Sequence, residues 1–105
     1  MNIAIASEGN NVGSNLGSSF GRCSCFVIYN CETRELEFLP NPYRQAEEKA
    51  GMASVQLLSS KGIKKIVSGE FGIKVKPLLD SLKIQMIVIP NPEKKIGEII
   101  EMLNH

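Results

Sequence analysis

Residues 65–89 have the sequence KIVSGEFGIKVKPLLDSLKIQMIVI, which contains the clearest topological signal in the chain. It begins with an apolar run, Lys65–Ser68, and ends with a second one, Ile84–Ile89; both are typical of buried strands. Between them, Ile73–Leu82 is expected to form a helix. A strand, a helix and a further strand in this order predict two parallel strands joined by a helical crossover.

The segments on either side of this stretch continue the alternation. Upstream, Gln45–Lys61 has alanines and leucines at helical spacing and is followed by Gly62, which predicts a helix that stops there. Downstream, Asn91 is expected to cap a third helix, with Pro92 at its first position and Glu93 in its first turn. The second half of the chain is therefore predicted to contain, in order, a helix, a strand, a helix, a strand and a helix.

The first half of the chain has three strand patterns and no helix pattern. Asn2–Ser7 is a short apolar strand, Cys23–Asn30 is a second, and Glu35–Leu39 alternates charged and apolar residues as a half-exposed edge strand does. We expect strands two and three to form an antiparallel meander, and strands one, four and five to be parallel. With 105 residues and no internal linker, residues 1–105 are expected to form one domain.

The composition narrows the class of protein. Hydrophobic residues make up 43% of the chain, which is enough to form a core. The formal net charge of +1 does not indicate binding to nucleic acid, which requires a strongly basic surface. No apolar run is long enough to span a membrane, and Met1 leads directly into a strand rather than a signal peptide. Three cysteines do not suggest a disulfide framework, so a cytoplasmic location is expected.

The segment Gly17–Cys31, GSSFGRCSCFVIYNC, brings a cation and two thiols to the exit of a glycine-rich loop. On an extended strand, Cys23 and Cys25 point the same way with their Cα atoms roughly 6.5 Å apart. Two such thiolates could bind one metal or an iron–sulfur fragment. Two buried thiols could equally be small core side chains. Arg22 beside them is either a surface cation or part of a salt bridge, or it contacts an anion or a cluster.

A second candidate site lies in the turn made of Gly69, Glu70, Phe71 and Gly72. A glycine turn that leads into a helix exposes backbone N–H groups and a partial positive charge, which suits an anion. Parallel strands one and four end at the same edge of the sheet, so the loop Ser7–Asn11 is expected to face this turn across one crevice. The alternative is an ordinary strand–helix turn.

An enzymatic function is not expected. A two-metal nuclease needs several clustered carboxylates, but the chain has one aspartate, Asp80, on a predicted helix, and Glu8 just past the first strand. The only histidine is His105, so no interior histidine can serve as a general base. A hydrolase is therefore the least favoured of the functions that we consider.

Several short motifs together resemble those of a known family. They are the opening strand Asn2–Ser7, the loop ending Phe20-Gly21-Arg22, Asn41-Pro42 after the third strand, Ala50-Gly51 in the first helix, and the turn Gly69–Gly72. In this order, over nearly the whole chain, they resemble the dinitrogenase iron–molybdenum cofactor biosynthesis family, which includes NifX-like proteins and the C-terminal domain of NifB-type proteins. Many members have a histidine before Phe-Gly-Arg, where this chain has Ser19.

The resemblance implies a fold and a function. The fold is α/β with a ribonuclease H-like motif: three α/β/α layers and a five-stranded mixed sheet of order 3-2-1-4-5, with strand two antiparallel. The function is non-catalytic binding and carriage of an iron–sulfur or iron–molybdenum cluster precursor, bound transiently. The expected partners are this cluster or a small anion, and a protein that takes part in cluster delivery. The alternative is a regulatory or structural domain that binds a small anion or a protein without metal.

Overall fold

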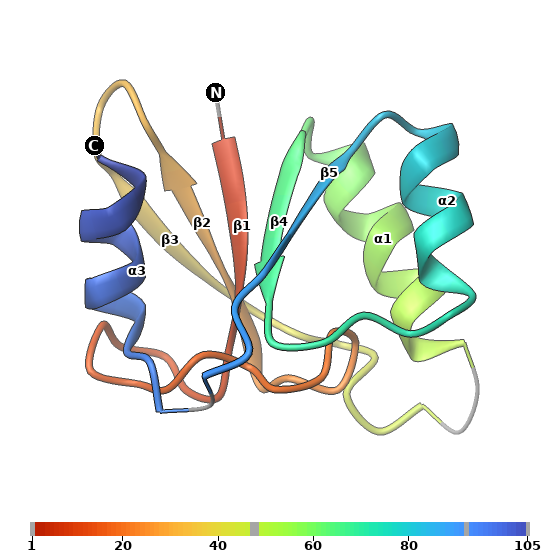
Figure 1. Ribbon diagram of the computed structural model, residues 1–105, viewed down its shortest axis with the longest axis horizontal. Coiled ribbons are helices and arrows are strands. Elements are labelled where there is room, and N and C mark those ends of the chain that lie inside the picture. Colours follow the sequence, from red (N-terminus) through yellow and green to blue (C-terminus); the bar gives the residue numbers. More distant parts are fainter. Residues whose placement is uncertain (1, 47–48, 92, 105) are drawn as a thin grey trace.

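The computed structural model describes residues 2–46, 49–91 and 93–104. Its elements are β1 (Asn2–Ser7), β2 (Cys25–Asn30), β3 (Leu36–Pro40), α1 (Ala50–Ser60), β4 (Lys65–Ser68), α2 (Val75–Ser81), β5 (Gln85–Val88) and α3 (Ile96–Leu103). The strands form one five-stranded sheet of order β3-β2-β1-β4-β5 (Figure 1). The pairs β1–β2 and β2–β3 are antiparallel, whereas β1–β4 and β4–β5 are parallel. This confirms the predicted fold class and strand order.

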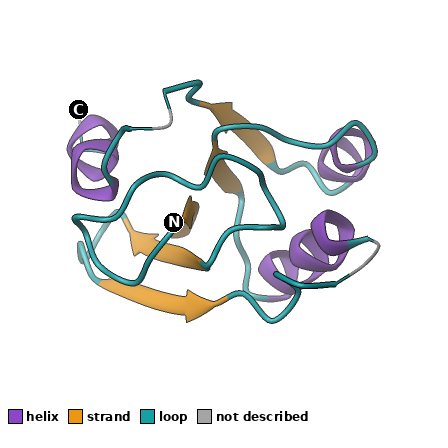
Figure 2. Cartoon of the chain, turned by 90° about the horizontal axis from the view of Figure 1, so that it is seen from below, coloured by secondary structure: helices purple, strands orange, loops and turns teal. Residues whose placement is uncertain are grey.

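Helices cover both faces of the sheet. On one face, Val55 and Leu58 of α1 and Leu79 of α2 pack on Ala4 and Phe26. On the other face, α3 buries its isoleucines against the alternate residues of β1, β2 and β4, which are Ile3, Ile5, Val27 and Val67. Side chains alternate between the faces of a strand, so two apolar faces of one sheet need two helical layers. Figure 2 shows α3 on the opposite side of the sheet from α1 and α2.

The loops that follow β1, β4 and β5 gather at one end of the sheet, together with the start of α1 (Figure 1). Parallel strands bring their carboxyl ends to the same edge, where ligands of open α/β sheets commonly bind. Among the described residues, no helix is long and apolar enough to cross a membrane.

Two helices begin later than the sequence predicts. Gln45 lies in a turn, and α1 starts only at Ala50, because Lys49 has left-handed backbone angles, φ 61° and ψ 22°, which end any helix that approaches it from upstream. Part of the predicted segment, Glu47 and Glu48, lies outside the described residues. The helix that was expected from Ile73 starts at Val75.

The prediction that Asn91 caps the third helix is wrong. Its side-chain oxygen accepts the Glu93 N–H at 3.0 Å in a local turn, and Pro92 lies outside the described residues. The helix begins at Ile96 after an extended Lys95, whose N–H donates to the Glu98 carboxylate at 3.0 Å. Asparagine stabilises turns and helix starts by the same local hydrogen bond, so the sequence alone does not separate the two.

Candidate functional site

Two of the motifs that carry the family resemblance meet backbone to backbone. Gly21, in Phe20-Gly21-Arg22, has φ +97°, and a Cβ at this position would lie 2.7 Å from the Cα of Gly51. A Cβ on Gly51 would in turn lie 2.7 Å from a methyl carbon of Val75 in α2. A side chain at Gly21 would force the loop away from the start of α1, and a side chain at Gly51 would press on Val75 of α2. The contact fixes the loop 17–22 against the first turn of this helix.

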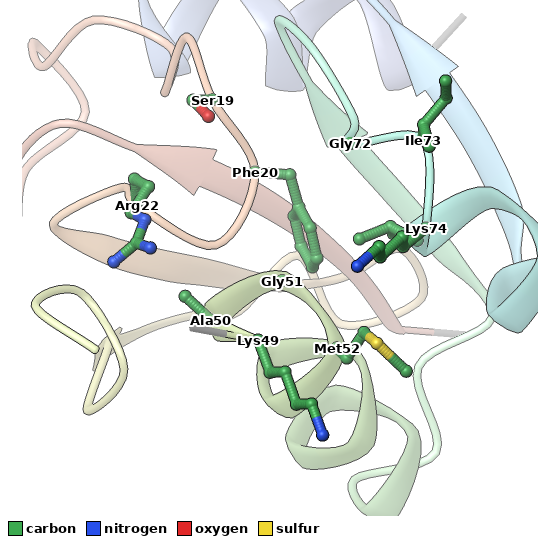
Figure 3. A pocket seen from close by; sticks show the side chains of 11 residues that line it. Ser19, Phe20, Arg22, Lys49, Ala50, Gly51, Met52, Gly72, Ile73 and Lys74 are labelled. Atoms are coloured by element: carbon green, nitrogen blue, oxygen red, sulfur yellow. The ribbon is translucent and has the colours of Figure 1, made fainter. Parts of the chain in front are cut away.

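A cavity of about 540 Å³ opens where this loop, the start of α1 and the segment before α2 come together (Figure 3). The described residues that line it are Ser19, Phe20, Arg22, Lys49, Ala50, Gly51, Met52, Gly72, Ile73, Lys74 and Val75. Its volume is in the range of small-molecule sites. We call it the basic cavity.

Three cationic side chains from three separate segments line the basic cavity. Figure 3 shows Arg22 on one side of Phe20, Lys74 on the other, and Lys49 below them. No acidic residue is among the described lining residues. The Arg22 guanidinium donates to the carbonyls of Arg44, at 3.3 Å, and Ala46, which anchors its charge at the edge of the cavity. The cavity therefore favours an anionic ligand.

Apolar groups complete the wall of the basic cavity. Phe20 is only 4% exposed and stacks on Phe71 with ring centroids 5.3 Å apart. Met52 and Val75 lie beside it, while Ile73 at the rim is 84% exposed. Apolar walls exclude water from a bound anion, and charge–charge attraction is stronger where the local dielectric constant is lower. The basic cavity thus combines charge with partial dehydration.

The crevice that the sequence predicted between Ser7–Asn11 and Gly69–Gly72 does not form. The backbone of Gly17 and Ser18 fills the space beside β4. The Gly69 N–H donates to the Gly17 carbonyl at 2.9 Å, and a Cβ on Gly69 would lie 2.9 Å from the Ser18 carbonyl oxygen. The long loop after β1 folds back onto the sheet. Short sequence patterns do not predict this contact, because it joins segments that are far apart in the sequence.

The residues predicted for this crevice are distributed over several places. Gly69 and Glu70 line a small cavity of about 180 Å³, and Gly72 lines the basic cavity. Phe71 packs against the core, stacked on Phe20. The Gly9 and Asn10 part of the first loop lines a third cavity, which also includes Cys25. Of the predicted ligand-binding residues, the structure brings Arg22 and Gly72 together.

Cys23 and Cys25 do not point the same way, contrary to the prediction. Cys23 lies in a bend before β2, where strand alternation does not apply, and it packs in the core cluster that includes Phe26. Cys25 pairs with Ser7 and has the parity of Val27, which packs on the opposite face, under α3. The two thiols therefore belong to different faces of the sheet.

The surroundings of both thiols disfavour thiolates. Burial raises the pKa of Cys23 from 9.0 to about 12, against the lowering effect of hydrogen bonds from the backbone of Ser7 and Gly21. Burial also raises the pKa of Cys25, whose thiol donates to the Gly9 carbonyl at 2.8 Å. In the described part of the chain, no group of three His, Cys, Asp or Glu side chains is placed to hold a metal ion. Burial therefore makes both thiols hard to ionise in the metal-free protein, and metal binding by Cys23 and Cys25 stays a prediction.

Sequence reasoning missed most of the basic cavity. Lys49, Met52 and Lys74 were not candidate residues, because lysines and methionines are common on surfaces and in cores. The available signal was the position of Lys49 next to the Ala50-Gly51 motif, together with the Phe20-Gly21-Arg22 motif that supplies the opposite wall. The contact between Gly21 and Gly51 joins these two motifs into one site.

The fold and the cavity define a small α/β protein with a basic, ligand-sized cavity at the carboxyl end of its sheet. The chain belongs to the family described as dinitrogenase iron-molybdenum cofactor, whose sequence model matches residues 1–105. No curated protein matches the chain.

Two solved structures share the fold. The apo form of the orange protein from Desulfovibrio gigas superposes with a TM-score of 0.89 at 21% identity, covering 97% of this chain and 85% of that one. An NMR structure from Thermotoga, provisionally described as a NifB protein, has a TM-score of 0.81 at 24% identity, again covering 97% of this chain and 85% of that one. These similarities establish the architecture, and the family links the chain to the iron–molybdenum cofactor of dinitrogenase.

Proposed function

We propose that this protein is a non-catalytic carrier that binds an anionic iron–sulfur or iron–molybdenum cluster precursor in the basic cavity. The observation that carries the proposal is the convergence of Arg22, Lys49 and Lys74 on one cavity without an acidic residue among its described lining residues. Family membership supports a molybdenum- or iron-containing cargo. The two solved structures support the fold that holds the cavity.

Charge, rather than cysteine ligation, holds the cargo in this proposal. Burial raises the pKa of the Cys23 thiol to about 12, and Cys23 is 1% exposed and is not among the described lining residues of the basic cavity. The three cations reach the cavity from separate segments and surround a bulky anion without forming bonds to its metal. The first turn of α1 adds the partial positive charge of a helix N-terminus. A cargo held in this way can leave without ligand exchange, as a carrier requires.

The placement of the carboxylates supports the non-catalytic part of the proposal. Asp80 is an exposed residue of α2, and Glu8 is exposed after β1. Neither belongs to a cluster of metal-ligating side chains among the described residues. If the cavity binds simple oxyanions as well as it binds sulfur-containing ones, the protein belongs to the alternative class, a domain that binds a small anion without metal.

Binding of tetrathiomolybdate, a molybdenum–sulfur dianion, tests the proposal. Calorimetric titration should give one site in the wild type, with weaker binding of molybdate. Cys23→Ala and Cys25→Ala should leave the dissociation constant within about twofold, because a ligand held by charge does not depend on thiols that do not line the cavity. Thermal unfolding of each variant controls for loss of fold. A loss of binding in folded Cys23→Ala or Cys25→Ala protein would show that thiolates ligate the cargo.

A further inference from the structure

Asn41 is a buried polar residue that follows β3 and contacts the loop around Arg22. Its side chain is 8% exposed, and its amide nitrogen donates two hydrogen bonds, to the Gly21 carbonyl at 2.9 Å and to the Cys23 carbonyl at 3.0 Å. These two carbonyls belong to the residues on either side of Arg22. A single amide group therefore clamps the backbone on both sides of this cation.

Two further hydrogen bonds hold Asn41 itself in place. Its side-chain oxygen accepts the Tyr43 N–H at 2.9 Å, and its own N–H donates to the Ser24 carbonyl at 3.1 Å. Both side-chain donors and the acceptor are thus in use. Removing the side chain would leave two carbonyls without these donors, which is costly where the groups are buried.

The same residue organises the segment that holds the other end of Arg22. The turn begun by the Tyr43 bond leads to Arg44 and Ala46, and the carbonyls of these two residues accept hydrogen bonds from the Arg22 guanidinium. Asn41 thereby fixes the backbone of Arg22 directly and its guanidinium through this turn. Asn41 does not itself line the basic cavity.

We infer that Asn41 is a positioning residue that sets where the charge of Arg22 stands at the basic cavity. The inference rests on the proposed function, since it concerns anion binding in that cavity. A residue that only stabilises the fold would change anion affinity equally with or without the Arg22 charge. A positioning residue changes affinity only while that charge is present, so the two roles differ in a double-mutant cycle.

The cycle uses the full chain and tetrathiomolybdate as the probe. Asn41→Ser, and Asn41→Ala as a second variant, should weaken binding by about five- to tenfold in the wild-type background. In the Arg22→Gln background the same changes should alter the affinity by less than about twofold. Asn91→Ser is the matched control, because Asn91 bonds a backbone N–H two residues on in the same way but is exposed and outside the cavity. It should not change affinity in either background.

A measurement on the wild type keeps the inference testable if the Asn41 variants fail to fold. Coupling between two sites is reciprocal, so a bound probe should slow hydrogen exchange of the Asn41 side-chain amide protons. Equal losses of affinity in both backgrounds, or exchange that does not respond to the probe, would overturn the positioning role. Wild-type protein that does not bind the probe would instead overturn the proposed function, so the two failures are distinguishable.

Discussion

Gly21→Ala is expected to lower the free energy of unfolding by about 2–5 kcal/mol, from backbone strain and from overpacking together. The residue has φ +97°, which L side chains rarely adopt, and the added methyl would lie 2.7 Å from both the Cα and the N of Gly51. Neither partner can move easily, because both are backbone. The loop would have to separate from the first turn of α1, and the basic cavity would lose one wall.

The variant Gly62→Ala separates the cost of backbone strain from the cost of overpacking. Gly62 also has a positive φ, +77°, but no atom lies within 4 Å of the position that its Cβ would take. This control should therefore lose only about 1 kcal/mol, the strain term alone. Urea unfolding followed by circular dichroism measures both variants. Equal losses in Gly21→Ala and Gly62→Ala would mean that the contact between the two motifs does not constrain the fold.

The double variant Lys49→Gln/Lys74→Gln should weaken tetrathiomolybdate binding by about 100-fold, if each charge contributes about 1.4 kcal/mol toward a dianion at the partly dehydrated site. Glutamine removes the charge and keeps a polar side chain that is one bond shorter than lysine. At Lys49 it also preserves the strained left-handed backbone, which glycine would relieve. The remaining affinity should fall less steeply with added salt than that of the wild type, because fewer charges are left to screen.

The matched control for this variant is Lys61→Gln/Lys64→Gln. It removes the same net charge from exposed positions at the other end of α1 and outside the cavity. If binding depends on the cations of the basic cavity, the control should change the affinity by less than about threefold at moderate ionic strength. Equal losses in the two double variants would show that net charge, and not the cavity, attracts the anion.

The sequence predicts the sheet well because its signals there are local. The apolar runs of β1 and β4 are buried strands inside the sheet, and each keeps its pattern within a few residues. The apolar run of β5 also forms a strand, but β5 is a half-exposed edge strand rather than a buried one. The alternation in the third strand likewise marks an edge. The directions of the strands and the two helical layers then follow from the rules for connections between strands and helices. The order of the strands in the sheet was implied by the family resemblance.

The site was less predictable because it depends on contacts between distant segments. The same-face prediction for Cys23 and Cys25 extended strand alternation by two residues into a bend. The prediction of a crevice did not foresee that Gly17 returns to β1. There the Gly17 N–H donates to the Ala6 carbonyl at 2.7 Å. Lys74 carries no local signal, since it looks like any exposed lysine until the fold places it opposite Arg22.

An NMR titration of the ¹⁵N-labelled protein with tetrathiomolybdate shows where an anionic cargo binds. If it binds in the basic cavity, saturable shifts are expected for the amides of Ser19–Arg22, Lys49–Met52 and Gly72–Val75, the three segments that line the cavity. The amides around Cys25 and Gly9, in a separate cavity, should move little. Saturable shifts confined to Gly9, Asn10 and Cys25, with the three lining segments unchanged, would show that the anion does not bind in the basic cavity.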